Sequence, residues 1–148
     1  MMEKRLKYLM TFYLSLLIFT CSYSQKLTCK SGNCYDGYGE IVHGENGTYV
    51  GEFEKGKMSG LGTYIGKLSM FRGEFKNNDF HGLGSLIIFE EFKGHPMTTI
   101  EFSGHWKNGK KHGMIKVDDY LNEVEKWCVY MNDELKEVLY EFDRSVKK

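Results

Sequence analysis

The side chains best suited to chemistry in this sequence are 5 histidines, 4 cysteines and a recurring pair of glutamates. His81 and His112 each precede a glycine at equivalent points of a repeated pattern, and Glu52 and Glu74 recur in the same way. A row of histidines is suited to binding a metal ion, and paired carboxylates are suited to acid–base catalysis. The other histidines are His43, His95 and His105.

Neither arrangement predicts an active site. Ser59 and Asp36 stand where the other copies have histidine, which breaks the row that a metal site needs. Carboxylates need a cleft that excludes water, which a single open sheet does not offer. No serine lies in a nucleophile elbow, and the Gly-x-Gly units lead into strands, whereas a phosphate loop opens a helix. We therefore expect no enzyme activity, no catalytic residue, no cofactor, no metal and no small-molecule substrate, and we assign the histidines a structural role.

The N-terminus has the order of a secretory signal peptide: basic residues, an apolar run, then small polar residues. Lys4, Arg5 and Lys7 precede the apolar residues 8–19, and residues 20–24 follow. The apolar run is shorter than the roughly 20 residues that a membrane span needs. The sequence thus predicts a signal peptide over residues 1–24 and a periplasmic, cell-envelope or secreted protein.

Processing of this segment leaves three outcomes open. Ser22 and Ser24 are small residues that favour cleavage before Gln25, whereas Cys21 resembles the acylation site of a bacterial lipoprotein. The third outcome is an uncleaved anchor. Cleavage before Gln25 removes three of 20 basic and one of 20 acidic residues, so 17 and 19 remain and the net charge is −2.

Composition excludes further classes. The chain has 148 residues, enough for one domain or a short repeat array, and its formal net charge is zero. Neutrality argues against binding to nucleic acid or to an anionic membrane by charge alone. Aromatic residues make up 15% of the chain, which argues against intrinsic disorder.

All 17 glycines lie between Gly32 and Gly113, and they mark a repeat. Residues 49–64 (YVGEFEKGKMSGLGTY), 71–86 (FRGEFKNNDFHGLGSL) and 102–117 (FSGHWKNGKKHGMIKV) share one pattern. In a strand, alternate residues share a face, so each copy places a glycine between two aromatic rings. The missing side chain leaves room for a ring of a neighbouring strand. Gly56, Asn78 and Gly109 align in the turns, which predicts a left-handed residue there.

These segments resemble the MORN (membrane occupation and recognition nexus) repeat, and the resemblance covers residues 37–117. The third copy departs from the pattern, since Ile115 replaces the second glycine of Gly-x-Gly. The resemblance implies an all-β fold, an antiparallel β-meander of stacked hairpins in one elongated curved sheet. It also implies a non-enzymatic protein that takes part in protein–protein contacts, scaffolding or association with membrane lipid.

Both ends of the repeat domain, residues 25–148, are expected to act as caps. In the partial repeat 26–41, Cys29 and Cys34 flank the sequence KSGN, which we expect to form a hairpin turn. Cysteines on either side of such a turn can face each other across the two strands. Because an exported protein lies in an oxidising compartment, we predict a disulfide between them. The rival interpretation, half of a metal site, lacks a second Cys/His pair. Cys128 is left unpaired, as a buried thiol or in an intermolecular disulfide.

Residues 124–142 fit two structures. Apolar residues recur with a helical period, which favours an amphipathic capping helix. The segment also aligns with residues 102–117, with Trp127 on Phe102. That alignment favours a degenerate last hairpin, in which Val129 and Val138 replace the packing glycines.

The connection between the second and third copies is longer than its counterpart between the first and second. It predicts a hairpin whose tip, Lys93, Gly94, His95 and Pro96, protrudes from the sheet. A binding loop and a longer connection without function both remain open.

Two functions follow. The first is an exported, non-enzymatic module that binds a protein partner, through a face of the sheet or through a sheet edge that adds a strand. The second is an envelope protein whose repeats contact lipid headgroups.

Overall fold

The computed structural model describes residues 28–92 and 95–147 and shows one antiparallel sheet of ten strands. The strands are β1 Thr28–Gly32, β2 Gly37–Val42, β3 Thr48–Glu54, β4 Lys57–Ile65, β5 Ser69–Lys76, β6 Asp79–Phe92, β7 His95–Lys107, β8 Lys110–Asp119, β9 Val124–Met131 and β10 Glu134–Asp143. Two short 3₁₀ helices, η1 Gly44–Asn46 and η2 Arg144–Lys147, complete the described structure.

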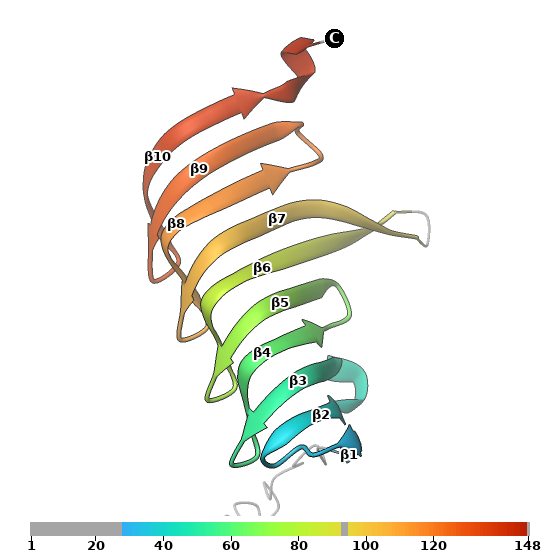
Figure 1. The fold of residues 1–148 in the computed structure, drawn as a ribbon. Coiled ribbons are helices and arrows are strands. Elements are labelled where there is room, and N and C mark those ends of the chain that lie inside the picture. Colours follow the sequence, from blue (N-terminus) through green and yellow to red (C-terminus); the bar gives the residue numbers. More distant parts are fainter. Residues whose placement is uncertain (1–27, 93–94, 148) are drawn as a thin grey trace, which may run out of the picture.

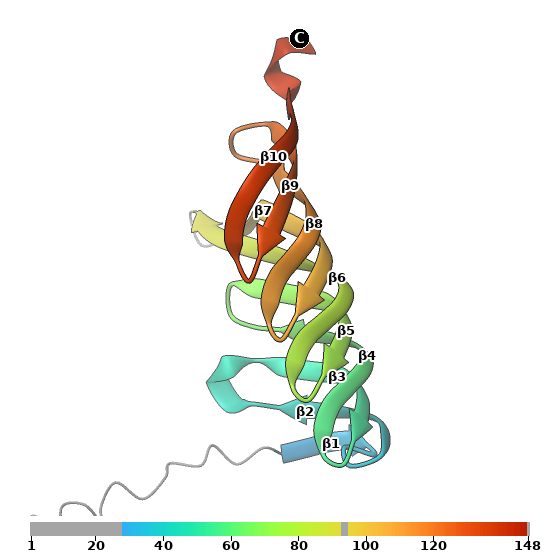
Figure 2. The same cartoon turned by 90° about the vertical axis from the view of Figure 1, so that its left-hand side faces the viewer.

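The strands follow one another in chain order, so every described strand pairs only with its sequence neighbours. Figures 1 and 2 show an elongated, twisted single layer, with no second layer of described residues over either face. The predicted all-β meander is therefore confirmed. No helix among residues 28–92 and 95–147 has the length and apolar character to cross a membrane.

Two-residue turns join alternate pairs of strands along one side of the sheet (Figure 1). Both central residues of each turn have positive φ, as in the type I′ turn that suits the twist of a hairpin. The second residue is Gly56, Asn78, Gly109 or Asp133, with φ between 71° and 77°. The left-handed turn position predicted from the sequence is thus confirmed.

A row of glycines crosses the sheet where the strands pair. Gly39, Gly51, Gly62, Gly73, Gly84 and Gly104 lie opposite one another on successive strands. The row continues through Ile115 on β8, Cys128 on β9 and Val138 on β10. The expectation that Val129 occupies this row is wrong, because Cys128 lies opposite Ile115 and a shift of one residue turns a side chain to the other face.

Aromatic rings lie against these glycines and form a core within the single layer. Tyr49 and Phe71 are fully buried, and Trp106 is 2% exposed. A Cβ on Gly62 would lie 2.4 Å from the Tyr49 hydroxyl oxygen, and one on Gly84 would lie 2.3 Å from Cζ of Phe71. The predicted packing of a ring over a neighbouring glycine is therefore confirmed. It lets one sheet bury large side chains without a covering layer.

Further ring contacts run along the face of the sheet that carries these rings, here called the inner face. Phe71 stacks on Phe80 at 3.8 Å between centroids, and Tyr49 meets Phe75 edge-on at 4.8 Å. The Trp106 indole Nε1 donates a hydrogen bond to the carbonyl of Gly84, 3.1 Å away. The rings of one hairpin therefore pack on the next one.

The N-terminal hairpin differs from its prediction in one respect. The sulfurs of Cys29 and Cys34 lie at disulfide-bonding distance, 2.11 Å, as predicted. The residues KSGN do not form the turn, however, because Lys30, Ser31 and Gly32 belong to β1. The connection runs over residues 33–36, so Cys34 lies in it rather than on the facing strand.

The C-terminal residues form a hairpin and not a helix, with a turn at Asn132 and Asp133. Trp127 does not take a position like that of the half-buried Phe102, because it lies directly beside Cys128 of the glycine row, on the other face of the sheet, and is 38% exposed. Cys128 lies in the glycine row, opposite Ile115, as a thiol that is 2% exposed. The expectation of a buried thiol is confirmed.

The inserted hairpin is longer than its neighbours, with 14 residues in β6 and 13 in β7, and it protrudes from the sheet (Figure 1). Lys93 and Gly94 of the expected binding loop lie outside the described residues. His95 and Pro96 begin β7. The signal peptide over residues 1–24 and Cys21 also lie outside the described residues.

Candidate functional site

The face of the sheet opposite the aromatic core carries a row of exposed apolar side chains, here called the outer ridge. It consists of the middle residue of each Gly-x-Gly unit and its counterparts: Tyr38, Leu61, Leu83 and Met114. Their exposed fractions are 64%, 61%, 65% and 54%. The residue that follows each of them lies in the glycine row and faces the core, so these side chains face solvent. Sequence analysis missed this ridge, although the hydrophobic residue inside Gly-x-Gly signals it.

Glutamates lie between the apolar residues of the ridge. Tyr38 pairs with Glu52 across β2 and β3, and Leu61 pairs with Glu74 across β4 and β5. On β7 the equivalent residue is His105, opposite Leu83. The ridge therefore alternates an apolar and a polar side chain from strand to strand.

Each glutamate also holds a bend in the strand beside it. Glu52 accepts a hydrogen bond from the backbone N–H of Leu61 at 3.2 Å, and Glu74 accepts one from Leu83 at 2.9 Å. These bonds lie at irregularities in the pairing, where Gly60 has φ 60° and its counterpart Gly82 has φ 54°. The recurrence of Glu52 and Glu74 thus has a structural cause. Both side chains are also exposed to solvent.

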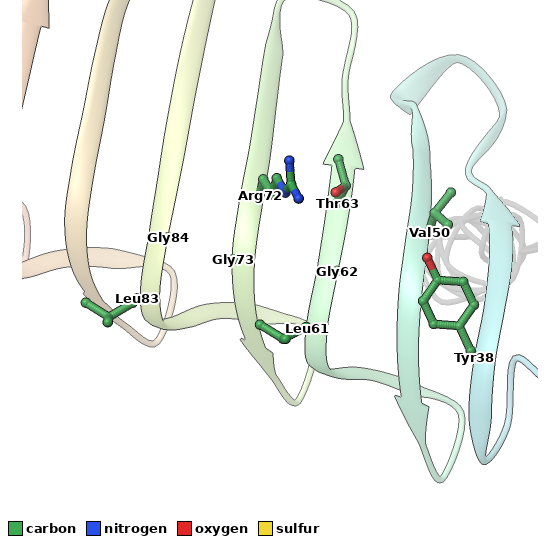
Figure 3. A pocket seen from close by; sticks show the side chains of 9 residues that line it. All are labelled: Tyr38, Val50, Leu61, Gly62, Thr63, Arg72, Gly73, Leu83 and Gly84. Carbon is green, nitrogen blue, oxygen red and sulfur yellow. The ribbon is translucent and has the colours of Figure 1, made fainter.

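A shallow hollow of about 500 Å³, here called the outer trough, runs beside the ridge. Its floor is the backbone of Gly62, Gly73 and Gly84. Figure 3 shows Leu61 and Leu83 on one side of these glycines, and Thr63 and Arg72 on the other. Tyr38 and Val50 complete the lining. The trough therefore has an apolar wall, a polar wall and a bare backbone floor.

The repeat histidines His81 and His112 lie on β6 and β8. Nδ1 of His81 and Nδ1 of His112 are buried and make no hydrogen bond to any described residue. No group of three or more His, Cys, Asp or Glu in the part of the chain that the structure describes is placed to hold a metal ion. His43 lies edge-on to Tyr64 beside another hollow of about 490 Å³ on the inner face, and burial lowers its pKa.

A network of charges ties the C-terminus to the sheet. Arg144 of η2 contacts the Asp118 carboxylate on β8 and lies 2.9 Å from Glu125 Oε2 on β9. Lys116 Nζ lies 3.1 Å from Asp118 and 3.3 Å from Glu125. The hydrogen bond that Arg144 donates lowers the pKa of Glu125, and the hydrogen bond that Lys116 donates to Asp118 raises the pKa of Lys116. With both carboxylates held by cations, the network acts as a structural clamp.

A comparison with known families matches the description MORN repeat to residues 49–67, 71–87 and 102–114. The three matches contain the ring–glycine–ring strands and type I′ turns described above. The third match ends directly before Ile115, where the repeat loses its second glycine. Eight of the nine residues that line the outer trough lie within the first two matched segments, and the ninth is Tyr38.

Proposed function

This chain carries three MORN repeats, and we propose that it is a non-enzymatic, exported module that binds a protein partner at the cell envelope. The observation that supports this proposal most is the outer ridge, in which four large apolar side chains are more than half exposed. An ordered row of this kind is typical of an interaction surface, whereas isolated exposed apolar residues are ordinary. The ridge extends over β2, β4, β6 and β8, so it offers a long docking surface.

The geometry favours binding over catalysis. Glu52 and Glu74 are exposed on a single-layer sheet, where water screens their charge. Acid–base chemistry depends on a position from which water is excluded. Both carboxylates also accept backbone hydrogen bonds that hold the fold.

Export is supported by two features of the chain. One is the basic, apolar and small-residue order of residues 1–24. The other is the Cys29–Cys34 pair, which lies at disulfide distance and suits an oxidising compartment. Intact-mass spectrometry of the protein from its native cells distinguishes the outcomes, because cleavage before Gln25, acylation at Cys21 and an uncleaved chain differ in mass.

The experiment for partner binding is a crosslinked pull-down of the tagged protein from its native cells, analysed by mass spectrometry. We expect one protein in near-stoichiometric amount, with crosslinks to the strands of the outer ridge. Recovery of lipids and abundant envelope proteins alone would contradict a dedicated protein partner.

The alternative function is contact with membrane lipid. It is favoured by Trp127 and Tyr140, which lie opposite each other on β9 and β10 and are 38% and 51% exposed. Tyrosine and tryptophan are suited to the membrane interface. A net charge of −2 after cleavage argues against attraction to anionic lipid. Pelleting with neutral and with anionic vesicles tests this function, and absence from both pellets would exclude it.

A further inference from the structure

The outer ridge repeats at the spacing of a particular backbone conformation. Its apolar residues Tyr38, Leu61, Leu83 and Met114 stand on every second strand of the sheet. Neighbouring strands lie about 4.8 Å apart, so successive apolar residues are spaced by about 9.6 Å. Between them stand Glu52, Glu74 and His105.

We propose that the outer ridge and trough bind a polyproline II segment of a partner protein, with apolar side chains at every third position and cationic side chains between them. This inference rests on the proposed function, since it specifies the chemistry of the protein partner.

The spacing selects polyproline II over the other regular conformations. A polyproline II helix has three residues per turn and rises 3.1 Å per residue, so its one-sided repeat is about 9.3 Å. Over the three intervals of the ridge the mismatch adds up to about 1 Å. An extended strand repeats a face every ~6.7 Å, and an α-helix repeats one every ~5.4 Å per turn, so neither stays in phase with the ridge.

The charge of the ridge selects a cationic segment. Glu52 and Glu74 are exposed, and neither forms an ion pair with any cationic side chain that the structure describes. Each carboxylate stands between two apolar ridge residues, where a lysine or arginine next to an anchoring side chain reaches it. Charges placed in this way favour the correct partner and speed its association.

The far wall of the trough supplies donors that such a segment needs. Arg72 is exposed on this wall, and no ion pair is formed by it with any described residue. Polyproline II has no internal hydrogen bonds, so its carbonyl oxygens are free to accept. The guanidinium of Arg72 and the hydroxyl of Thr63 lie opposite the apolar wall (Figure 3), where they face those carbonyls.

The binding test uses the exported chain and a fluorescent 12-residue probe made of four Leu-Pro-Lys units, followed by fluorescence anisotropy. A second peptide has the same composition with its leucines at irregular spacings, and a third replaces lysine by glutamate. We expect the periodic cationic probe to bind at least about ten-fold more tightly than either control. Equal affinity for the periodic and irregular peptides would overturn the proposal.

The variant Glu52→Gln/Glu74→Gln tests the site without removing the fold. A glutamine side chain keeps an oxygen that accepts the N–H of Leu61 or Leu83, but it loses the charge. We expect about ten-fold weaker binding of the periodic probe, from two lost ion pairs. The matched control Glu45→Gln/Glu134→Gln changes two exposed glutamates away from the ridge and should bind as the parent chain does. Unchanged binding by the ridge variant would overturn the proposal.

Failure here is distinguishable from failure of the proposed function. A protein partner that crosslinks to other strands, and that binds the ridge variant as well as the parent, overturns the polyproline II inference and leaves partner binding intact. A Leu83→Ser variant adds an apolar test on the same probe, and its circular dichroism spectrum shows whether it is folded. Unchanged binding by folded Leu83→Ser would also overturn the inference.

Discussion

At the scale of single residues, the sheet depends on pairs of one glycine and one aromatic ring on adjacent strands. Tyr49 is fully buried although no second layer covers it, because its ring lies over Gly62. Its hydroxyl donates to the carbonyl of Glu52 at 3.0 Å, and burial raises its pKa. The ring therefore has no free space into which it can move.

The change Gly62→Ala should be strongly destabilising. The new Cβ would lie 2.4 to 2.6 Å from three atoms of the Tyr49 ring and hydroxyl. Because Tyr49 is held on all sides, we expect a loss of about 3 kcal/mol in the free energy of unfolding, measured by urea denaturation. The control is Gly66→Ala, whose Cβ would first meet the Ser69 hydroxyl at 3.2 Å. It should change stability by less than about 0.5 kcal/mol, and equal losses in both variants would refute the ring–glycine explanation.

At the scale of elements, each type I′ turn is tied to the preceding hairpin. Asn78 accepts a hydrogen bond from the backbone N–H of Met58 at 2.8 Å, and Asp133 accepts one from Lys111 at 2.9 Å. The backbone N–H of Gly109 donates to Phe80 at 2.9 Å in the same way, but glycine has no side-chain oxygen to offer in return. The link at Gly109 therefore lacks the side-chain hydrogen bond that Asn78 and Asp133 supply at theirs.

The change Gly109→Asn should complete that link. Gly109 has φ 77°, which asparagine tolerates, and a Cβ there would lie 3.8 Å from Asp79 Oδ1. The new oxygen would accept the N–H of Phe80, so we expect a gain of about 1 kcal/mol in the free energy of unfolding. The control Gly109→Ala adds the same Cβ without an acceptor and should lose about 1 kcal/mol in urea denaturation. A stability of Gly109→Asn at or below that of Gly109→Ala would show that the side-chain bond does not form.

The last strand is held by the clamp of Arg144, so its stability should depend on pH. Because Arg144 lowers the folded-state pKa of Glu125, the clamp contributes fully above the ordinary pKa of 4.5 and is lost as the pH falls through the lowered value. We expect Arg144→Gln to lower the urea midpoint at pH 7 and to flatten its decline between about pH 5 and pH 3. Lys55→Gln, which removes an exposed cation near Glu54 at 3.8 Å, is the control and should leave both unchanged. A parallel pH dependence in Arg144→Gln and the parent would contradict the clamp.

The sequence predicted the elements well because their chemistry is local. Ring–glycine–ring strands and the left-handed residues Gly56, Asn78 and Gly109 follow from side-chain size and backbone freedom alone. Register was harder to predict, since a slip of one residue exchanges Cys128 with Val129 at the buried row without changing the apolar pattern. The outer ridge was not predicted, because the repeat was defined by its glycines and aromatic rings. The residue between the two glycines of Gly-x-Gly was not considered. Its use of Glu52 and Glu74 as backbone acceptors depends on the irregular pairing, which spacing alone does not reveal.

At the scale of the whole molecule, the sheet is a linear stack in which each described strand pairs only with its neighbours in the chain. Two groups of buried residues follow one another along it. The first includes Tyr49, Phe71 and Trp106, and the second consists of Ile115, Val117 and Cys128. Phe102 of β7 packs against both groups and so connects them. Stability in such a stack is expected to be regional, a sum of repeats and their interfaces.

Native-state hydrogen exchange followed by mass spectrometry should reveal these two regions. Gly62→Ala disturbs the first group, so we expect faster exchange in β3–β5 and little change in β9–β10. Arg144→Gln should do the reverse, because its contacts lie on β8 and β9. The two variants thus act as controls for each other. If either variant instead accelerated exchange evenly along the sheet, the ten strands would open as one cooperative unit, and the coupling through Phe102 would be stronger than the packing between individual hairpins.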